Sequence, residues 1–250
     1  MNYHIITGAS RGIGEAVAKK LMVPGNHLLC IARSANPELV SLAEQREVTL
    51  DYITMDLADV QGLEARIHAV LEKIDKRRAK AISLVNNAGM LKPMRPIDQM
   101  RGEDIVDNMH VNLVAPMILT SAFIAYVQEI PADKRIINIS SGAGKKPYYG
   151  WSHYCSAKAG IDLFTKCVAV EQKNQAHPVQ VVSFAPGVVD TAMQAEIRST
   201  PKEHFQDLDR FVALKEDGAL LAPDEVAECM VTRLLQGSFE SGALLDIRQM

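Results

Sequence analysis

Seven short apolar runs, separated by segments with helical patterns, constrain the fold of this 250-residue chain more than any other feature. Each run is rich in Val, Ile and Leu, and the segments between runs are long enough for crossover helices. Such runs are typical of strands in a parallel sheet that helices cover on both faces. Right-handed crossovers then predict a doubly wound α/β fold. The predicted strands are Tyr3–Thr7, His27–Ala32, Val48–Met55, Ala81–Asn86, Arg135–Ser140, Val179–Ala185 and Ala243–Ile247.

Nothing in the sequence divides the chain into smaller units. It has no Pro/Gly/Ser-rich linker, no internal repeat and no low-complexity tract. Its length suits one large α/β domain, so we expect a single domain over residues 1–250. A polar segment at about 191–217, between the sixth strand and the last helix, favours a two-helix insertion.

Composition excludes several classes of protein. A net charge of −3 and a pI near 6.2 argue against a nucleic-acid surface. We see no apolar run of the roughly 20 residues that a bilayer requires, and no room for a signal peptide. The histidines and the cysteines lack the spacing of metal ligands, and we expect mostly buried, reduced thiols at Cys30, Cys155, Cys167 and Cys229. These features predict a cytoplasmic protein without a metal site.

A glycine-rich turn follows the first predicted strand and leads into a helical pattern. Its spacing is Gly-x-x-x-Gly-x-Gly, and strand, glycine-rich turn and helix are the context of a dinucleotide site. Glycines let the backbone approach a pyrophosphate, and the helix start offers free N–H groups and the positive end of its dipole. The sequence therefore predicts cofactor contacts from Gly8, Ser10, Arg11, Gly12, Ile13 and Gly14.

Tyr154 and Lys158 stand four residues apart in a helical pattern, which places both side chains on one face. A nearby ammonium favours the phenolate of a tyrosine, whose ordinary pKa is about 10. The pair alone also fits an amphipathic surface helix. Ser141 lies thirteen residues before Tyr154, directly after a predicted strand, and Ser140 is its nearest competitor.

With Asn86-Asn87-Ala88-Gly89 and Asn112, these motifs resemble the short-chain dehydrogenase/reductase family over nearly the whole chain. The resemblance implies a Rossmann-type fold and hydride transfer from a nicotinamide cofactor to a carbonyl carbon. It implies that Tyr154 donates the proton and that Lys158 stabilises the phenolate and binds the nicotinamide ribose. It also implies that Ser141 orients the carbonyl oxygen, and that Asn112 supports a water linked to Lys158.

The cofactor is expected to be NADP(H). Where NAD sites carry an acid for the ribose hydroxyl, this chain has Arg33 and Ser34, and Arg11 lies in the glycine-rich turn. Two guanidinium groups suit a 2′-phosphate. Asp56 is expected at the adenine, although it or Asp59 would also suit as the cap of a helix starting near Val60. The resemblance implies further cofactor contacts from Leu57, Asn87, Ala88, Gly89, Pro186, Gly187, Val189 and Thr191.

The run Lys146–Trp151, together with Ser183–Gly187 and Ser241–Asp246, resembles the sepiapterin reductase branch, and above all the bacterial benzil reductases. The resemblance implies an aryl 1,2-diketone substrate, such as benzil reduced to (S)-benzoin, and a lid at about 191–217. It also implies a homodimer or homotetramer. Clustered aromatics suit an aryl substrate, or else dimer or loop packing. The expected substrate contacts are Ser141, Tyr148, Trp151, Tyr154 and Asp246, which aligns with the acid that anchors the pterin.

Three alternatives remain at the level of the sequence. The first is a sepiapterin or pterin side-chain reductase, although the residues after Asp246 depart from that pattern. The second is an NAD-linked alcohol dehydrogenase, against which Arg33 argues. The third is a non-catalytic dinucleotide-binding regulator, against which the retained Tyr154 and Lys158 argue.

Overall fold

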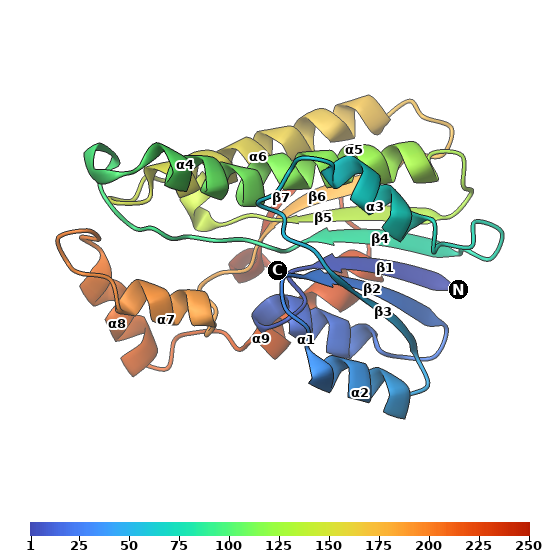
Figure 1. Cartoon of the computed structure of the whole chain (residues 1–250), viewed down its shortest axis with the longest axis horizontal. Coiled ribbons are helices and arrows are strands. Elements are labelled where there is room, and N and C mark those ends of the chain that lie inside the picture. Colours follow the sequence, from blue (N-terminus) through green and yellow to red (C-terminus); the bar gives the residue numbers. More distant parts are fainter.

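The computed structural model describes all 250 residues and contains one seven-stranded sheet, parallel throughout (Figure 1). The strand order is β3-β2-β1-β4-β5-β6-β7, so the chain runs outward from β1 in two directions. All seven predicted strands are present, and their ends agree with the prediction to within two residues. The strands are β1 (Asn2–Thr7), β2 (Asn26–Ala32), β3 (Thr49–Thr54), β4 (Ala81–Asn86), β5 (Asp133–Ile139), β6 (Gln180–Ala185) and β7 (Leu244–Asp246).

Helices cover both faces of the sheet, as Figure 1 shows. Successive strand residues point to opposite faces. Ile6 therefore packs into one core cluster, under α1 (Gly12–Leu21), α2 (Pro37–Gln45) and α9 (Pro223–Cys229). Ile5 packs into the other, under α3 (Leu63–Leu71), α5 (Ala115–Val127) and α6 (Ser152–Gln172), beside which α4 (Gly102–Met109) lies. The predicted doubly wound fold is confirmed.

Two helices stand apart from these layers, beyond the carboxyl ends of the strands. They are α7 (Ala192–Arg198) and α8 (Leu208–Glu216), drawn in orange at the left of Figure 1. Together they form the two-helix insertion expected at 191–217. A bridge between Val189 and Leu221 closes its base, because Asp190 donates its backbone N–H to Leu221 and Leu221 donates to Val188.

The helical stretch Gly102–Val127 is long and apolar enough, by length and composition, to cross a membrane. The sequence reasoning missed this stretch because it considered apolar runs alone. Here α4, a π-helical turn η2 (His110–Val114) and α5 join into one helix. Leu119 and Phe123 of α5 are fully buried in the core, which is the packing of a core helix.

The cysteines are less buried than we expected. Cys30 is buried in β2, but Cys155 and Cys229 are half-buried and Cys167 is exposed on α6. The expectation of mostly buried thiols is therefore wrong, because Cys167 lies on the outward face of its helix.

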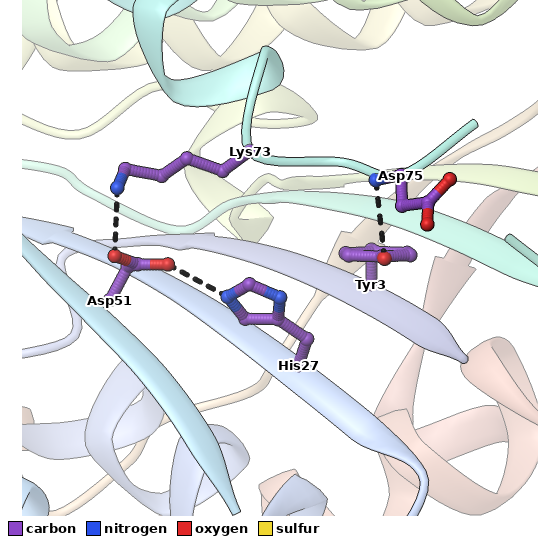
Figure 2. A network of polar contacts seen from close by, with 5 residues as sticks. All are labelled: Tyr3, His27, Asp51, Lys73 and Asp75. Carbon is purple, nitrogen blue, oxygen red and sulfur yellow. Dashed lines mark hydrogen bonds and ion pairs between the residues drawn. The ribbon is translucent and has the colours of Figure 1, made fainter. Parts of the chain in front are cut away.

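A polar network joins the sheet to the loop after α3 (Figure 2). The Asp51 carboxylate accepts from Lys73 Nζ at 2.8 Å and contacts His27 Nε2 at 2.7 Å. The Asp75 backbone N–H donates to the Tyr3 hydroxyl at 3.2 Å. Because Tyr3 and His27 lie near the starts of β1 and β2, this network belongs to the amino end of the sheet.

Candidate active site

The glycine-rich turn packs tightly against the loop after β4. Gly8 has a φ of +69°, and a Cβ there would lie 2.9 Å from Ala88 Cα. A Cβ at Gly14 would lie 2.4 Å from the Gly8 carbonyl oxygen. The Asn87 side chain donates to the carbonyls of Thr7 at 2.9 Å and Gly8 at 3.3 Å. The first and fourth strands thus end in one interlocked pair of loops that admits only glycine at these two positions.

The amino end of α1 is open to an anion. Arg11 precedes the helix and no side chain caps it, so the first-turn N–H groups and the helix dipole face outward. Arg11 and Arg33 are both exposed, and neither is paired with a carboxylate. The Asn36 side chain donates to the Ser10 carbonyl at 3.1 Å and holds the loops after β1 and β2 together. The Tyr52 hydroxyl donates a hydrogen bond to the Ser34 carbonyl at 3.0 Å.

Asp56 and Leu57 follow the third strand, which ends at Thr54, and Leu57 is buried. Asp56 Oδ1 accepts from the backbone N–H of Ala58 at 2.9 Å. The alternative role as a helix cap is wrong for both acids. The helix begins at Leu63 behind Gly62, no side chain caps it, and Asp59 pairs with Arg66.

The loop after β6 reaches the glycine-rich turn. It contains Pro186, the buried Val189 and Gly187, whose φ is +75°. A Cβ at Gly12 would lie 3.3 Å from Thr191 Cγ2, so the two loops are neighbours. The cofactor residues predicted after β1, β4 and β6 therefore meet at the carboxyl edge of the sheet, where ligands of such sheets bind.

Tyr154 and Lys158 lie on one face of α6 and are 7% and 4% exposed. Lys158 Nζ is 5.6 Å from the centre of the Tyr154 ring and donates to the Ile139 carbonyl at 2.8 Å. Burial raises the pKa of Tyr154 to about 12, against a hydrogen bond with Ser141 that lowers it. Burial also lowers the pKa of Lys158 to about 8, against the attraction of Asp162. At neutral pH this site therefore holds a protonated phenol beside an ammonium.

Ser141 stands at the end of β5 and caps a short 3-10 turn, η3 (Gly142–Gly144). Its Oγ accepts from the Ala143 N–H at 3.1 Å. The competing Ser140 is buried, and its Oγ has no hydrogen-bond partner. Because Ser141 is the serine whose hydrogen bond affects Tyr154, the structure favours Ser141 over Ser140.

Asn112 lies in the π-helical turn η2 and is 1% exposed. Its Nδ2 donates to the Met90 carbonyl at 2.7 Å and to Asn108, and its Oδ1 accepts from the Met90 N–H at 3.2 Å. A Cβ at Gly89 would lie 3.1 Å from Asn112 Oδ1 and 3.9 Å from Lys158 Nζ. Asn112 and Lys158 thus flank Gly89. Sequence reasoning missed the π-helical turn, a feature that often marks functional sites.

Asp162 was also missed, although it lies four residues after Lys158 on the same helix, a spacing the sequence displays. It is buried, and the Ser183 hydroxyl donates to its Oδ1 at 2.5 Å. A Cβ at Gly144 would lie 2.9 Å from Asp162 Oδ2. Asp162 therefore joins β6, α6 and the turn after Ser141.

An aromatic cluster lies beside Tyr154. Trp151 is edge-on to Tyr154 at 5.9 Å between ring centres and stacks on Phe205 at 4.7 Å, and Tyr148 lies 4.7 Å from Trp151. Phe205 and Phe211, which sequence reasoning did not single out, come from the 191–217 segment. Trp151 is almost wholly buried among them, which confirms loop packing as one role of these aromatics. Tyr148 is half-buried and Tyr149 is exposed.

Asp246 ends β7 beside Ala185 of β6, and is 4% exposed. Its carboxylate is held by Arg248, two residues later, which sequence reasoning passed over. The hydrogen bonds from Arg248 hold the pKa of Asp246 below its usual range.

Comparison with known proteins agrees with this geometry. The short chain dehydrogenase family model matches residues 2–202. The chain belongs to the short-chain dehydrogenase family. It is accordingly an oxidoreductase, and the resemblance stated from its motifs is confirmed.

Two curated members of the family match almost the whole chain. "Benzil reductase ((S)-benzoin forming)" of Bacillus cereus is 48% identical over 247 residues, which cover 99% of each chain. Sepiapterin reductase of Mus musculus is 31% identical over 256 residues, with 97% of this chain and 95% of that protein covered.

Solved structures have the same fold. The KRED1-Pglu enzyme superposes with a TM-score of 0.84 at 31% identity, covering 98% of this chain and 100% of that one. An actinorhodin polyketide ketoreductase solved with NADPH has a TM-score of 0.80 at 27% identity, covering 98% and 95%.

Proposed function

We propose that this protein is an NADPH-dependent carbonyl reductase whose substrate is an aryl 1,2-diketone, such as benzil reduced to (S)-benzoin. The buried, protonated Tyr154 beside the Lys158 ammonium carries the proposal. Reduction of a ketone requires a proton donor for the carbonyl oxygen. The 48% identity to a protein named for this reaction supports the substrate class.

The open start of α1 and the loops after β1, β4 and β6 suit NADP(H). The first-turn N–H groups of α1 would hold the pyrophosphate, and the exposed Arg11 and Arg33 would hold the 2′-phosphate. When bound, the reduced nicotinamide supplies the hydride for the carbonyl carbon. Arg33→Asp should weaken NADPH more than NADH. Equal weakening of NADPH and NADH binding would show that Arg33 does not contact the 2′-phosphate.

Tyr154 is the general acid of this proposal. As negative charge develops on the carbonyl oxygen, the phenol donates its proton there, and the hydroxyl of Ser141 donates a hydrogen bond to the same oxygen. Ser141 stands close enough to Tyr154 to lower its pKa, which supports their acting on one atom.

Lys158 stabilises the phenolate that remains. Its only protein partner is the Ile139 carbonyl, so two of its three N–H donors are left for the ribose and for a proton relay. Asn112 would support the relay from the far side of Gly89, whose missing side chain leaves room between the two groups.

The aromatic cluster supplies an apolar wall for the substrate. Trp151 lies next to Tyr154, and Tyr148 lies next to Trp151. The segment 191–217, which contains α7 and α8, packs against them as the lid. We also propose that the protein is cytoplasmic, as its composition predicts, and that it forms a homodimer or homotetramer, as its family resemblance implies.

Loss of absorbance at the reduced-nicotinamide band, with benzil and either NADPH or NADH, tests the proposal. We expect consumption of NADPH only, with (S)-benzoin as the product on a chiral column. Tyr154→Phe should abolish turnover while NADPH still binds. Near-normal turnover by Tyr154→Phe would reject the mechanism.

A pterin side-chain reductase is the second candidate, since Asp246 is a buried acid at the end of the terminal strand and a sepiapterin reductase matches 97% of this chain. Reduction of sepiapterin without reduction of benzil would favour it. Oxidation of alcohols with NAD would favour an alcohol dehydrogenase. NADPH binding without turnover of any carbonyl would favour a regulator.

A further inference from the structure

Asp246 is a buried carboxylate whose counter-ion comes from the last turn of the chain. Arg248 donates to Asp246 Oδ1 from its backbone N–H at 3.0 Å and from Nε at 2.8 Å. Its Nη2 donates to Oδ2 at 2.5 Å. Two guanidinium N–H groups thus meet two carboxylate oxygens, the strongest geometry available to an ion pair. The Asp246 side chain is 4% exposed but that of Arg248 is 66% exposed, so the arginine covers the acid from the solvent side.

The pair lies at the edge of the proposed substrate site. Asp246 pairs with Ala185 at the carboxyl end of β6, and a Cβ at Gly187 would lie 3.2 Å from Ile247 Cγ2. Lys145, which follows the turn that Ser141 caps, is close enough to lower the pKa of Asp246. Tyr148 of the aromatic cluster is close enough to raise the pKa of Arg248. The ion pair therefore lies at the carboxyl edge of the sheet, beside the loop after β6.

A buried carboxylate requires charged or hydrogen-bonded partners. A substrate group with two adjacent N–H donors, such as a guanidine or an aminopyrimidinone, would bind the same two oxygens and would have to displace Arg248. The arginine is tethered two residues away, so its effective concentration at the acid is high. A substrate without such donors has no use for Asp246 and meets no competition.

We propose that Arg248 determines substrate specificity by occupying Asp246 as a tethered internal ligand. It excludes carbonyl substrates that carry a paired N–H donor group and admits those that lack one. The reaction itself rests on the proposed function, but the competition for Asp246 does not.

Arg248→Ala and Arg248→Met test the proposal with benzil and sepiapterin, whose aminopyrimidinone ring presents two adjacent N–H donors. We expect the ratio of kcat/KM for sepiapterin to that for benzil to rise about tenfold or more, mainly through a lower KM for sepiapterin. Asp246→Asn in the Arg248→Ala background should remove the gain. Lys145→Ala is the matched control, because it removes a neighbouring positive charge without touching the carboxylate. An unchanged ratio in both arginine variants, or an equal rise in Lys145→Ala, would overturn the proposal.

Binding without turnover separates this proposal from the proposed function. Quenching of the fluorescence of an unreactive pterin should give a Kd about tenfold lower for folded Arg248→Ala than for the wild type. If neither benzil nor sepiapterin is reduced, the proposed function fails and the titration still decides the role of Arg248. Equal pterin affinity in the wild type and in both arginine variants would reject that role.

Discussion

Two lysines are buried at opposite ends of β5, and they differ in the number of carbonyls to which each ammonium donates. Lys134, near the start of the strand, is 1% exposed and donates to three carbonyls, those of Val127, Gln128 and His177. Lys158 of α6 is 4% exposed and donates to one carbonyl, that of Ile139, at the end of the strand. Burial lowers the pKa of both.

An ammonium has three donors, so Lys134 is satisfied by the protein alone and Lys158 is not. A buried charge without a full set of partners costs stability. The difference indicates that Lys134 holds loops together at the amino end of the sheet. Lys158 lowers the stability of the fold, and its ammonium serves the chemistry at the carboxyl end. Replacing the two lysines should therefore change stability in opposite directions, and only the replacement of Lys158 should change activity.

The largest effect is expected for Lys158→Met. Loss of the ammonium beside Tyr154 should lower kcat by about 10²–10⁴-fold. The same change removes a desolvated charge, so the free energy of unfolding at pH 7 should rise by about 1–2 kcal/mol. Steady-state kinetics and urea unfolding measure both, with the exposed Lys166→Met on the same helix as the control. Lower stability together with lost activity would show that Lys158 is a structural residue like Lys134.

Lys134→Met should lower stability and leave activity unchanged. It leaves three carbonyls without their donor, so the free energy of unfolding should fall by about 1–3 kcal/mol. The kcat and KM of the folded fraction should not change, since the residue lies at the other end of the strand from the site. Urea unfolding and active-site-normalised kinetics provide the check. A change in kcat as large as the one at Lys158 would erase the distinction between the two ends.

The pH dependence sharpens the comparison further. Since the pKa of Lys158 is about 8 in the folded protein and 10.5 when unperturbed, the unfolded chain binds more protons between these values. Wild-type stability should therefore rise relative to Lys158→Met across pH 8 to 10.5, and the stability gap between the two should be largest below pH 8. If catalysis requires the ammonium, kcat/KM for NADPH should fall above about pH 8.

Asp162→Asn should shift the pH at which kcat/KM falls on the alkaline side. Asp162 raises the pKa of Lys158, so removing its charge should shift the fall in kcat/KM to lower pH by about one unit or less. Asparagine keeps an oxygen for the Ser183 hydroxyl, so the fold should be retained. Asp98→Asn, on the exposed surface, is the control. An unmoved limb would mean that Asp162 acts on Lys158 only through packing.

The smallest effect is expected in the network of Figure 2. Asp51 pairs with Lys73, whose side chain is 44% exposed, and with His27. Solvent screens such pairs, so Asp51→Asn should lower the free energy of unfolding by no more than about 1 kcal/mol and leave kcat unchanged. A loss larger than that at Lys134 would place the main polar anchor of the amino end here instead.

Much of the molecule could be predicted from sequence because the determining interactions are local or periodic. Strand runs such as Ala81–Asn86 are mostly apolar, and the glycine-rich turn requires backbone conformations that few other residues adopt. The pairing of Tyr154 with Lys158 follows from helical spacing. Some missed features have no local signal: Phe205 and Phe211 meet Trp151 only after the chain has folded, and the π-helical turn at Asn112 has no marker in the residues around it. Asp162 and Arg248 were missed although each lies close in the sequence to the residue it acts on, because the sequence does not show that those residues are buried.

The sequence by itself determined the doubly wound sheet, the order of its strands along the chain and the residue types at the site, because hydrophobic periodicity and glycine conformation are properties of short segments. Only the tertiary structure decided which charges are satisfied. The sequence singles out Lys158 by its spacing from Tyr154, but it does not show that Lys134 is equally buried or that Asp246 is buried against Arg248. Burial and the positions of the carbonyls around each ammonium distinguish the two lysines, since the cost of a buried charge depends on every neighbour that the folded chain brings to it.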